Sequence, residues 1–211
     1  MKDKKVLIYG AGNIEVLKVL LPKCNIIGFI DDDKNKKGQL IGGFEVIGSW
    51  AEVKKEFRKD EVLIVNNVSR DCKLHKKIFE RVKSEGYNLL TAIHDSIHTD
   101  WVKKIGEGVV IHENTYIGPG VIIEDNVEIK YAVNLAHECI IGSHTLISPG
   151  VTLNGRIKIG AEVFIGAGAV IMPNVNIGEG SIIGIGSVVM KDVPPWSTVL
   201  GNPAKVIWRR K

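Results

Sequence analysis

The chain has 211 residues, of which 45% are hydrophobic and 25% are charged, and its net charge is +4 at pH 7. That length fits two domains, and the hydrophobic content suffices for a sizeable core. No basic stripe interleaves with aromatic residues, and the first apolar run, residues 6–9, is far too short for a signal or a membrane span. We therefore expect a globular protein that binds neither nucleic acid nor membrane. Its three scattered cysteines favour free thiols and a cytoplasmic location.

The first segments of the chain predict a βαβ unit. Residues 4–9 and 25–30 are apolar runs typical of buried parallel strands, and between them lie the glycine-rich stretch GAGNIE and a helical pattern. This order is typical of Rossmann-like sheets that bind nucleotides. Glu15 stands where a dinucleotide-binding turn has its third glycine. A nicotinamide oxidoreductase is therefore a weaker alternative, and it would leave the second half of the chain unexplained.

Later segments complete a small open parallel sheet over residues 1–95. Further strands are predicted over 44–48, 61–67 and 87–93. Ser49 and Glu52 form a capping box that opens one helix, and a second helix runs from about Asp71 to Ser84. Ligands of such sheets bind at the carboxyl ends of the strands. That edge carries Gly10, Gly12, Asn13, Asp31, Asp32 and Asn66.

From residue 105 onward, an aliphatic residue recurs at every sixth position without a slip. These lead residues are Ile105, Ile111, Ile117, Ile123, Ile129, Leu135, Ile141, Ile147, Leu153, Ile159, Ile165, Ile171, Ile177, Ile183 and Val189. A helix cannot use this period, because the apolar position would drift around its axis. Three short strands and three corners can, so eighteen residues make one turn of a triangular prism. Hexapeptide repeats indicate a parallel β-helix, here of about five coils.

His137 is the strongest candidate for chemistry in the repeat. It occupies a corner position with its side chain outward, and Gly155 stands at the same corner one coil later, which leaves a notch beside the imidazole. Imidazole is a fit general base at neutral pH, although a surface histidine without a role is the alternative. His144 lies seven residues away and no third histidine has a suitable spacing, so we predict no metal site.

Several stretches of the chain match one known family. They are VLIYGAG, FIDDDKNKKGQLIGGFEVIG, the strand-link His94, AHECIIG, GRIKIGAEVFIGAGAVI and GNPAK. Through them the chain resembles the sialic acid O-acetyltransferase family of hexapeptide-repeat acyltransferases, which includes nucleotide-linked amino-sugar N-acetyltransferases of bacterial glycan pathways. The resemblance covers nearly the whole chain. It implies a Rossmann-like sugar- or nucleotide-binding domain over 1–95 and a left-handed parallel β-helix over 96–211.

The resemblance also implies a mechanism and a co-substrate. His137 would be the general base and Glu138 its acidic neighbour, provided the corner turns the two side chains together. Acetyl-CoA would lie in a groove between two prisms, which implies a homotrimer. Its contacts would fall at Leu146, Gly155, Ala167 and Ile185. The basic tail, Lys205 or residues 209–211, could meet the phosphate of the cofactor.

The N-terminal sheet of the family holds the nucleotide or the sugar. The matching positions are Gly12, Asn13, Ile14, Asp31, Asp32 and Asn66. Relatives usually carry Gly-His where this chain has Asn13 and Ile14, and an asparagine where it has Lys130, which could bind a carboxylate or phosphate. We expect acetyl transfer to a nucleotide-linked amino sugar. O-acetylation of sialic acid or a related sugar, and a trimeric scaffold without catalysis, stay open.

Overall fold

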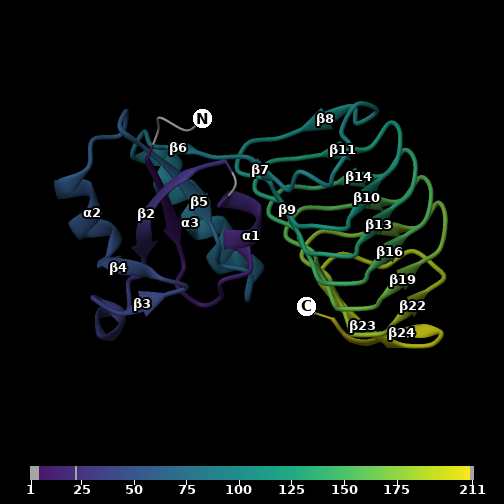
Figure 1. The fold of residues 1–211 in the computed structure, drawn as a ribbon. Coiled ribbons are helices and arrows are strands. Elements are labelled where there is room, and N and C mark those ends of the chain that lie inside the picture. Colours follow the sequence, from purple (N-terminus) through teal and green to yellow (C-terminus); the bar gives the residue numbers. More distant parts are fainter. Residues whose placement is uncertain (1–4, 22, 210–211) are drawn as a thin grey trace.

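The computed structural model describes residues 5–21 and 23–209, which form an α/β sheet beside a three-sided prism (Figure 1). Lys4 of the first expected strand lies outside the described residues. So do Arg210 and Lys211 of the basic tail. Within the described ranges, no helix has the length and apolar character needed to cross a bilayer.

The N-terminal part is a six-stranded sheet in the order β3-β4-β2-β1-β5-β6. Its elements are β1 Lys5–Tyr9, α1 Val16–Leu20, β2 Asn25–Ile30, the 3-10 turn η1 Lys34–Lys36, β3 Leu40–Ile41, β4 Phe44–Gly48, α2 Trp50–Glu56, β5 Val62–Asn66, α3 Cys72–Ser84 and β6 Asn88–Leu89. Alternate residues of β1 face opposite sides of the sheet. Val6 and Ile8 pack with α1, whereas Leu7 and Tyr9 pack with α2 and α3. The helices therefore cover both faces of the sheet.

The expected helix signals are confirmed, but the sheet is not wholly parallel. Ser49 and Glu52 form the capping box, and the side chain of Asp71 caps α3. One short strand that was not among those expected, β3, pairs antiparallel with β4 at the edge of the sheet. Gly42 and Gly43 supply the turn, both with positive φ, and this is the glycine pair that tight hairpins favour.

The repeat forms the expected triangular prism, and we name its faces A, B and C. Face A contains β7 Ala92–Ile93, β9 Val110–Ile111, β12 Glu128–Ile129, β15 Leu146–Ile147, β18 Phe164–Ile165, β21 Ile182–Ile183, β23 Ser197–Gly201 and β24 Ala204–Arg209. Face B contains β10 Tyr116–Ile117, β13 Asn134–Leu135, β16 Thr152–Leu153, β19 Val170–Ile171 and β22 Val188–Val189. Face C contains β8 Lys104–Ile105, β11 Ile122–Ile123, β14 Ile140–Ile141, β17 Lys158–Ile159 and β20 Asn176–Ile177.

Residues eighteen apart lie one above the other throughout the prism. Ile123 pairs with Ile141, for example, and the repeated pairing continues along every face. From Ile111 onward each lead residue is at most 6% exposed, and together they form one continuous core. Ile105, at the open end of the column, is half-buried. The stacked aliphatic interior predicted from the period is therefore confirmed.

Both ends of the prism depart from a simple repeat. The single strand expected over 87–93 is divided, because β6 stays in the N-terminal sheet while β7 pairs with β9 of the prism. At the other end β23 and β24 form an antiparallel hairpin on the last coil. That hairpin turns at residues 202–203, as the sequence GNP indicates.

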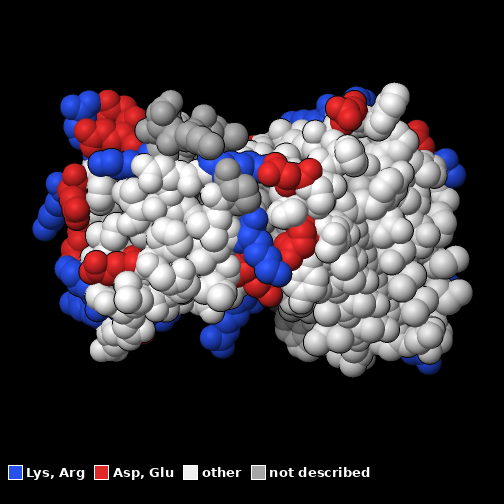
Figure 2. All heavy atoms as spheres, in the orientation of Figure 1, with Lys and Arg blue, Asp and Glu red and all other residues white. Residues whose placement is uncertain are grey.

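The N-terminal part docks on face A and on the two corners that flank it. Val110 on β9 joins the core beneath α1. Lys18 pairs with Glu113 at 3.0 Å on the corner between faces A and B. Lys76 pairs with Glu162 at 2.6 Å on the corner between faces C and A. In Figure 2, basic and acidic side chains gather where the N-terminal part meets the prism, while the side of the prism in view is largely uncharged.

We predict that the stability of the prism depends on the stacked interior and far less on the outward side chains. On β11, Ile123 is fully buried and its neighbour Ile122 is only partly buried. Ile123→Ala should lower the free energy of unfolding by about 2–5 kcal/mol, because it leaves a cavity in a packed column. Ile122→Ala is the matched control and should cost under about 1 kcal/mol. Urea unfolding of both variants measures the difference, and equal losses would contradict this account of the core.

Candidate active site

His137 lies at the corner between faces B and C, on the connection from β13 to β14. The neighbouring Glu138 has φ 57°, so the chain bends sharply between the two residues. This bend brings Nδ1 of His137 within 3.1 Å of Oε2 of Glu138. Arg156, from the next coil, lies 3.6 Å from the same carboxylate oxygen. The corner therefore turns the histidine and its acidic neighbour toward each other.

Gly155 lies directly against the imidazole. A Cβ atom at residue 155 would fall 2.4 Å from Nε2 of His137, so only glycine leaves room for the ring. With its proton on Nδ1, the ring donates to Glu138 and keeps the lone pair of Nε2 free. The side chain of His137 is 45% exposed, so solvent or a ligand can reach it. This arrangement leaves Nε2 able to accept a proton from a neighbouring group.

Ala167 and Ile185 stack on a different corner, the one between faces A and B. Ile185 is 74% exposed and Ala167 is half-buried. Face B separates this corner from His137 within one chain. The outward residues of face B carry no charge; they are Tyr116, Asn134, Thr152, Val170 and Val188. The structure thus brings His137 and Gly155 together, but not with Ala167 and Ile185.

Leu146 does not lie on a groove. It faces outward from β15 on face A, where it is 3% exposed and where the thiol of Cys72 meets its backbone. The expectation that Leu146 contacts a cofactor was therefore wrong, because the N-terminal part covers this face. His112 and His144 also point out of the prism. His112 is fully buried, and His144 is half-buried with the ring of Phe79 packed against it. Across the described residues, no three His, Cys, Asp or Glu side chains gather to hold a metal ion.

A cavity of about 650 Å³ opens at the carboxyl edge of the N-terminal sheet. Its lining includes four of the expected substrate positions, Gly12, Asn13, Asp31 and Asp32. Ile14 does not line it and is 53% exposed instead. The loop from β5 to α3 forms the opposite wall through Asn67, Val68, Ser69 and Arg70.

The two acidic residues of the cavity are held by the protein itself. Lys36 donates to Asp31 at 2.7 Å and the backbone N–H of Ala11 does so at 3.1 Å. Burial opposes ionisation of Asp31, but these bonds hold its pKa below the usual range. Asp32 is likewise held by Trp50, Tyr9 and Arg81 at 2.7–3.0 Å, and its pKa is also lowered. Both carboxylates therefore hold the walls of the cavity together through hydrogen bonds within the protein.

Asn66 does not line the cavity and joins the two parts of the protein. It is 1% exposed and donates to the backbone oxygen of His75 at 2.8 Å and to the side chain of Asn126 at 3.0 Å. The expectation that Asn66 contacts a substrate at this edge therefore has no support from the structure. Asn67, which follows β5 directly, is the asparagine in the cavity wall. Adjacent residues of a strand face opposite sides, but the sequence alone does not say which side holds the ligand.

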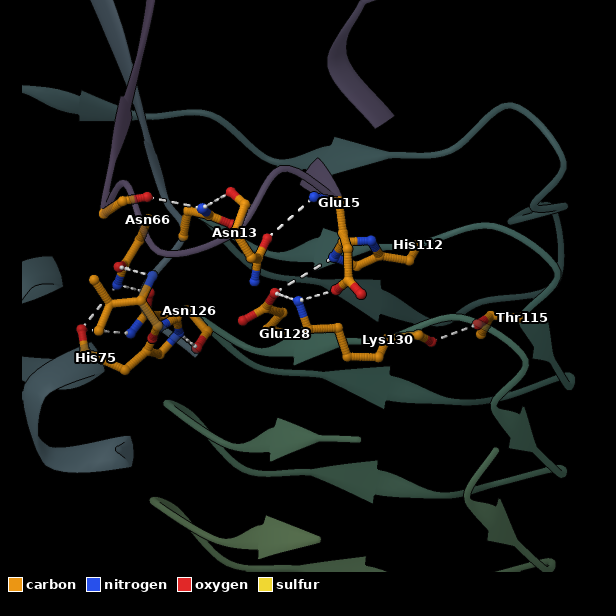
Figure 3. Close-up of polar contacts among 12 residues, drawn as sticks. Asn13, Glu15, Asn66, His75, His112, Thr115, Asn126, Glu128 and Lys130 are labelled. Carbon is orange, nitrogen blue, oxygen red and sulfur yellow. Dashed lines mark hydrogen bonds and ion pairs between the residues drawn. The ribbon is translucent and has the colours of Figure 1, made fainter. Parts of the chain in front are cut away.

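Lys130 is already paired with carboxylates. Its ammonium lies 2.7 Å from Glu128 and 3.1 Å from Glu15, beneath the glycine-rich turn, and His112 contacts the same oxygen of Glu128 (Figure 3). Burial opposes ionisation of Glu128, but His112 and Lys130 outweigh it and hold its pKa at about 2. The expectation that Lys130 binds an anionic ligand therefore has no support from this geometry. The residue ties the turn to the prism instead.

Within one chain His137 and the cavity lie apart. The contacts described above between residues 5–90 and the prism all fall on face A or its two flanking corners. His137 stands on the corner opposite face A in a triangular section. A reaction that uses both the cavity and the imidazole therefore needs a second copy of the chain.

Comparison with known proteins finds one matching segment in each part of the chain. Residues 156–191 match the family described as bacterial transferase hexapeptide (six repeats), and residues 2–90 match C2185-like, N-terminal. The chain therefore carries hexapeptide repeats of the kind found in bacterial transferases. Its prism is the left-handed parallel β-helix that the resemblance implied, and it follows an α/β domain.

Two solved structures are similar to this hexapeptide-repeat protein over nearly its whole length. The acetyltransferase domain of PglB from Neisseria gonorrhoeae FA1090 is 27% identical with a TM-score of 0.86, over 97% of this chain and 100% of that one. It is also known in complex with acetyl coenzyme A. PerB from Caulobacter crescentus, in complex with CoA and GDP-perosamine, is 26% identical with a TM-score of 0.87, over 96% of each chain.

A curated relative matches a shorter stretch. The acyl-[acyl-carrier-protein]–UDP-N-acetylglucosamine O-acyltransferase of Helicobacter pylori (strain Shi470) is 43% identical over 107 residues, which are 47% of this hexapeptide-repeat protein. The match spans 40% of the length of that relative.

The buried carboxylate of Glu128 predicts a pH-dependent contribution to stability. Its pKa in the folded protein is about 2, below the ordinary 4.5, so its contribution is present above about 4.5 and is lost as the pH falls toward 2. Glu128→Gln should lower the free energy of unfolding at neutral pH by about 3 kcal/mol, because it leaves Lys130 half-paired in the interior.

The difference between the two proteins should then shrink as the pH falls, which urea unfolding at neutral and acid pH measures. Glu124→Gln removes a surface ion pair with Lys104 and serves as the control, with an expected cost under about 1 kcal/mol. If the stability lost in Glu128→Gln does not change with pH, the assigned ionisation of Glu128 is contradicted.

Proposed function

We propose that this protein transfers an acetyl group from acetyl-CoA to the amino group of a nucleotide-linked amino sugar in bacterial surface-glycan biosynthesis. The observation that carries the proposal is the imidazole of His137, held by Glu138 against Gly155 on an exposed corner. This site lies in a chain that resembles the PglB acetyltransferase domain and PerB over both of its domains. A PglB structure contains acetyl coenzyme A, and the PerB structure contains CoA with GDP-perosamine.

The proposed reaction uses the free lone pair on Nε2 of His137. The amine nitrogen of the acceptor attacks the thioester carbonyl carbon while Nε2 of His137 takes the amine proton. The tetrahedral intermediate collapses, the carbon–sulfur bond breaks, and the imidazolium returns the proton to the departing thiolate. The products are an amide and free coenzyme A. Glu138 stabilises the imidazolium and keeps the ring in place.

The complete site would form between copies of the chain. We assign a homotrimer in which His137 and Gly155 of one copy face Ala167 and Ile185 of the next, with the pantetheine arm between them. The uncharged face B lies between these two corners and is not covered by the N-terminal domain, which suits an interface. Lys205 and Arg209, on β24 at the end of the prism, would meet the phosphates of the cofactor.

The acceptor would bind in the N-terminal cavity, against Gly12 and Asn13. We place the reaction in the cytoplasm, because all three cysteines are unpaired. O-acetylation is the second candidate, since the curated Helicobacter pylori relative is an O-acyltransferase. Free amino sugars and sialic acid, tested beside nucleotide-linked amino sugars, distinguish the two reactions.

Loss of His137 should abolish most of the activity. His137→Ala should fold normally and lower kcat by roughly 10²–10⁴-fold, the usual contribution of a positioned base. Release of the coenzyme A thiol, measured with UDP-, dTDP- and GDP-linked amino sugars, reports the rate. His98→Ala, at an exposed histidine on the segment before β8, is the control and should keep the parental rate. Full activity in His137→Ala would exclude this imidazole as the base.

Two inactive variants should restore one another if the site is shared between copies. A Cβ at Gly12 meets no atom within 4 Å, so Gly12→Leu can fill the cavity while the chain folds. When Gly12→Leu and His137→Ala are co-expressed, about one quarter of the sites should be active. Each site needs an intact imidazole from one copy and an intact cavity from another, and each of these is present in half of the chains. Thiol release by the mixed protein measures this recovery. No recovery, with both variants present in one oligomer, would contradict a shared site.

A further inference from the structure

The charged side chains of the N-terminal cavity do not all have partners. Those that line it are Asp31, Asp32, Lys36 and Arg70. Lys36 pairs with Asp31 at 2.7 Å. Arg81, from α3, pairs with Asp32 at 2.7 Å. Within the described residues, no ion pair or hydrogen bond joins the side chain of Arg70 to the rest of the chain, so one uncompensated positive charge lines the cavity.

Arg70 stands on the loop from β5 to α3, and the backbone of this loop is fixed on both sides of it. Before Arg70, the ring of His75 donates from Nδ1 to the backbone oxygen of Val68 at 2.7 Å. After it, the side chain of Asp71 accepts from the backbone N–H of Lys73 at 2.9 Å and caps α3. Arg70 itself is exposed. The loop therefore holds an unpaired guanidinium at a defined place, where a ligand can reach it.

Arg70 also lines a second cavity, which lies between the start of α3 and the prism. This cavity has a volume of about 390 Å³, and its wall includes Lys73, Glu162 and Phe164. Lys73, like Arg70, is exposed, and its ammonium has no ion pair in the described part of the chain. Lys73 lines the second cavity and not the first. The two cations are thus close in sequence, but of the two only Arg70 reaches the N-terminal cavity.

An unpaired guanidinium in such a cavity favours a ligand with an anionic group. Guanidinium binds phosphate and carboxylate oxygens through two parallel N–H donors, and such charge-assisted hydrogen bonds are stronger than neutral ones. The cavity, of about 650 Å³, has the usual size of a small-molecule site. On the opposite wall, a Cβ at Gly12 would meet no atom within 4 Å. There is therefore room for a phosphate between the glycine-rich turn and Arg70.

We propose that Arg70 is a substrate-binding residue, whose guanidinium binds the diphosphate of a nucleotide-linked sugar across the cavity from the glycine-rich turn. The carboxylates of Asp31 and Asp32 can only accept hydrogen bonds, so they suit hydroxyl groups of the ligand and not its phosphates. The proposal rests on the proposed function and adds the residue that recognises the anionic part of the acceptor. Coenzyme A also carries a diphosphate, and sialic acid carries a carboxylate, so the test includes both.

The test measures the affinity that a diphosphate adds to a nucleoside. Calorimetry compares GDP, UDP and dTDP with their nucleosides, and ligand-observed NMR serves for the weaker ligands. In the parental protein, at least one diphosphate should bind more tightly than its nucleoside. In Arg70→Gln this gain should fall by roughly ten- to hundredfold, the usual contribution of a hydrogen bond to a charged group, while the nucleoside binds as before. A damaged cavity would weaken the nucleoside as well.

Lys73→Gln is the matched control. It removes the same charge close by, but from the second cavity, so it should lower the gain by less than about twofold. Arg70→Lys keeps the charge without the planar fork and should retain part of the gain. All three variants should unfold at the parental temperature, because neither side chain is bonded to another described residue. The affinity for coenzyme A should be the same in Arg70→Gln as in the parental protein.

The results distinguish failure of this proposal from failure of the proposed function. The role of Arg70 is overturned, while acetyl transfer stands, if the parental protein shows no gain, if the gain survives in Arg70→Gln, or if Lys73→Gln loses as much. It is also overturned if Arg70→Gln weakens coenzyme A or sialic acid and leaves the diphosphates unaffected. A parental protein that binds none of the nucleoside diphosphates overturns the nucleotide-linked acceptor of the proposed function itself.

Discussion

The eighteen-residue coil is the constraint on which the candidate site depends. It stacks every residue on the one eighteen places earlier, so each site contact on the prism is a relation between neighbouring coils. His137 has its notch because Gly155 is one coil away, and Ala167 stands beneath Ile185 for the same reason. The buried aliphatic column holds this register. A one-residue slip would turn its side chains out to solvent.

The candidate site residues of the prism lie at its corners, because the strand residues on its faces form the hydrogen bonds between coils. Each strand has only two residues in register with its neighbours, which leaves the connecting residues free to adopt other conformations. At Glu138 the chain takes a left-handed conformation, which costs a non-glycine residue about 1–2 kcal/mol. That bend is what brings the carboxylate to the imidazole. The stacked coils on either side stabilise it.

The period of the repeat predicts most of the prism, but it does not predict what covers the prism. The lead residues, the corner histidine and its glycine all follow from spacing alone. Leu146 and Lys130 were expected at a ligand because the resemblance places them where relatives carry other site residues. Both lie under the N-terminal domain, and docking between domains leaves no periodic signal. A lysine next to Glu128 on an outward face could have suggested a buried pair.

The N-terminal cavity lies at the edge of the sheet that was predicted, but not every predicted residue lines it. Gly12, Asn13 and the two aspartates do line it, because strand ends are visible in the sequence. The choice between Asn66 and Asn67 depends on which side of β5 faces the prism, and two adjacent asparagines give no preference. The roles of the aspartates depend on Lys36, Tyr9 and Arg81, which only the folded chain brings together.

Because His137 and the cavity lie apart within one chain, the proposed mechanism requires several copies of the chain to assemble. The most direct measurement is therefore the molar mass of the protein by light scattering, taken with the specific rate of thiol release over a dilution series. This account predicts three times the chain mass of 23.2 kDa in the active protein, and a specific rate that falls as the assembly dissociates. A monomer that keeps the full specific rate would contradict it.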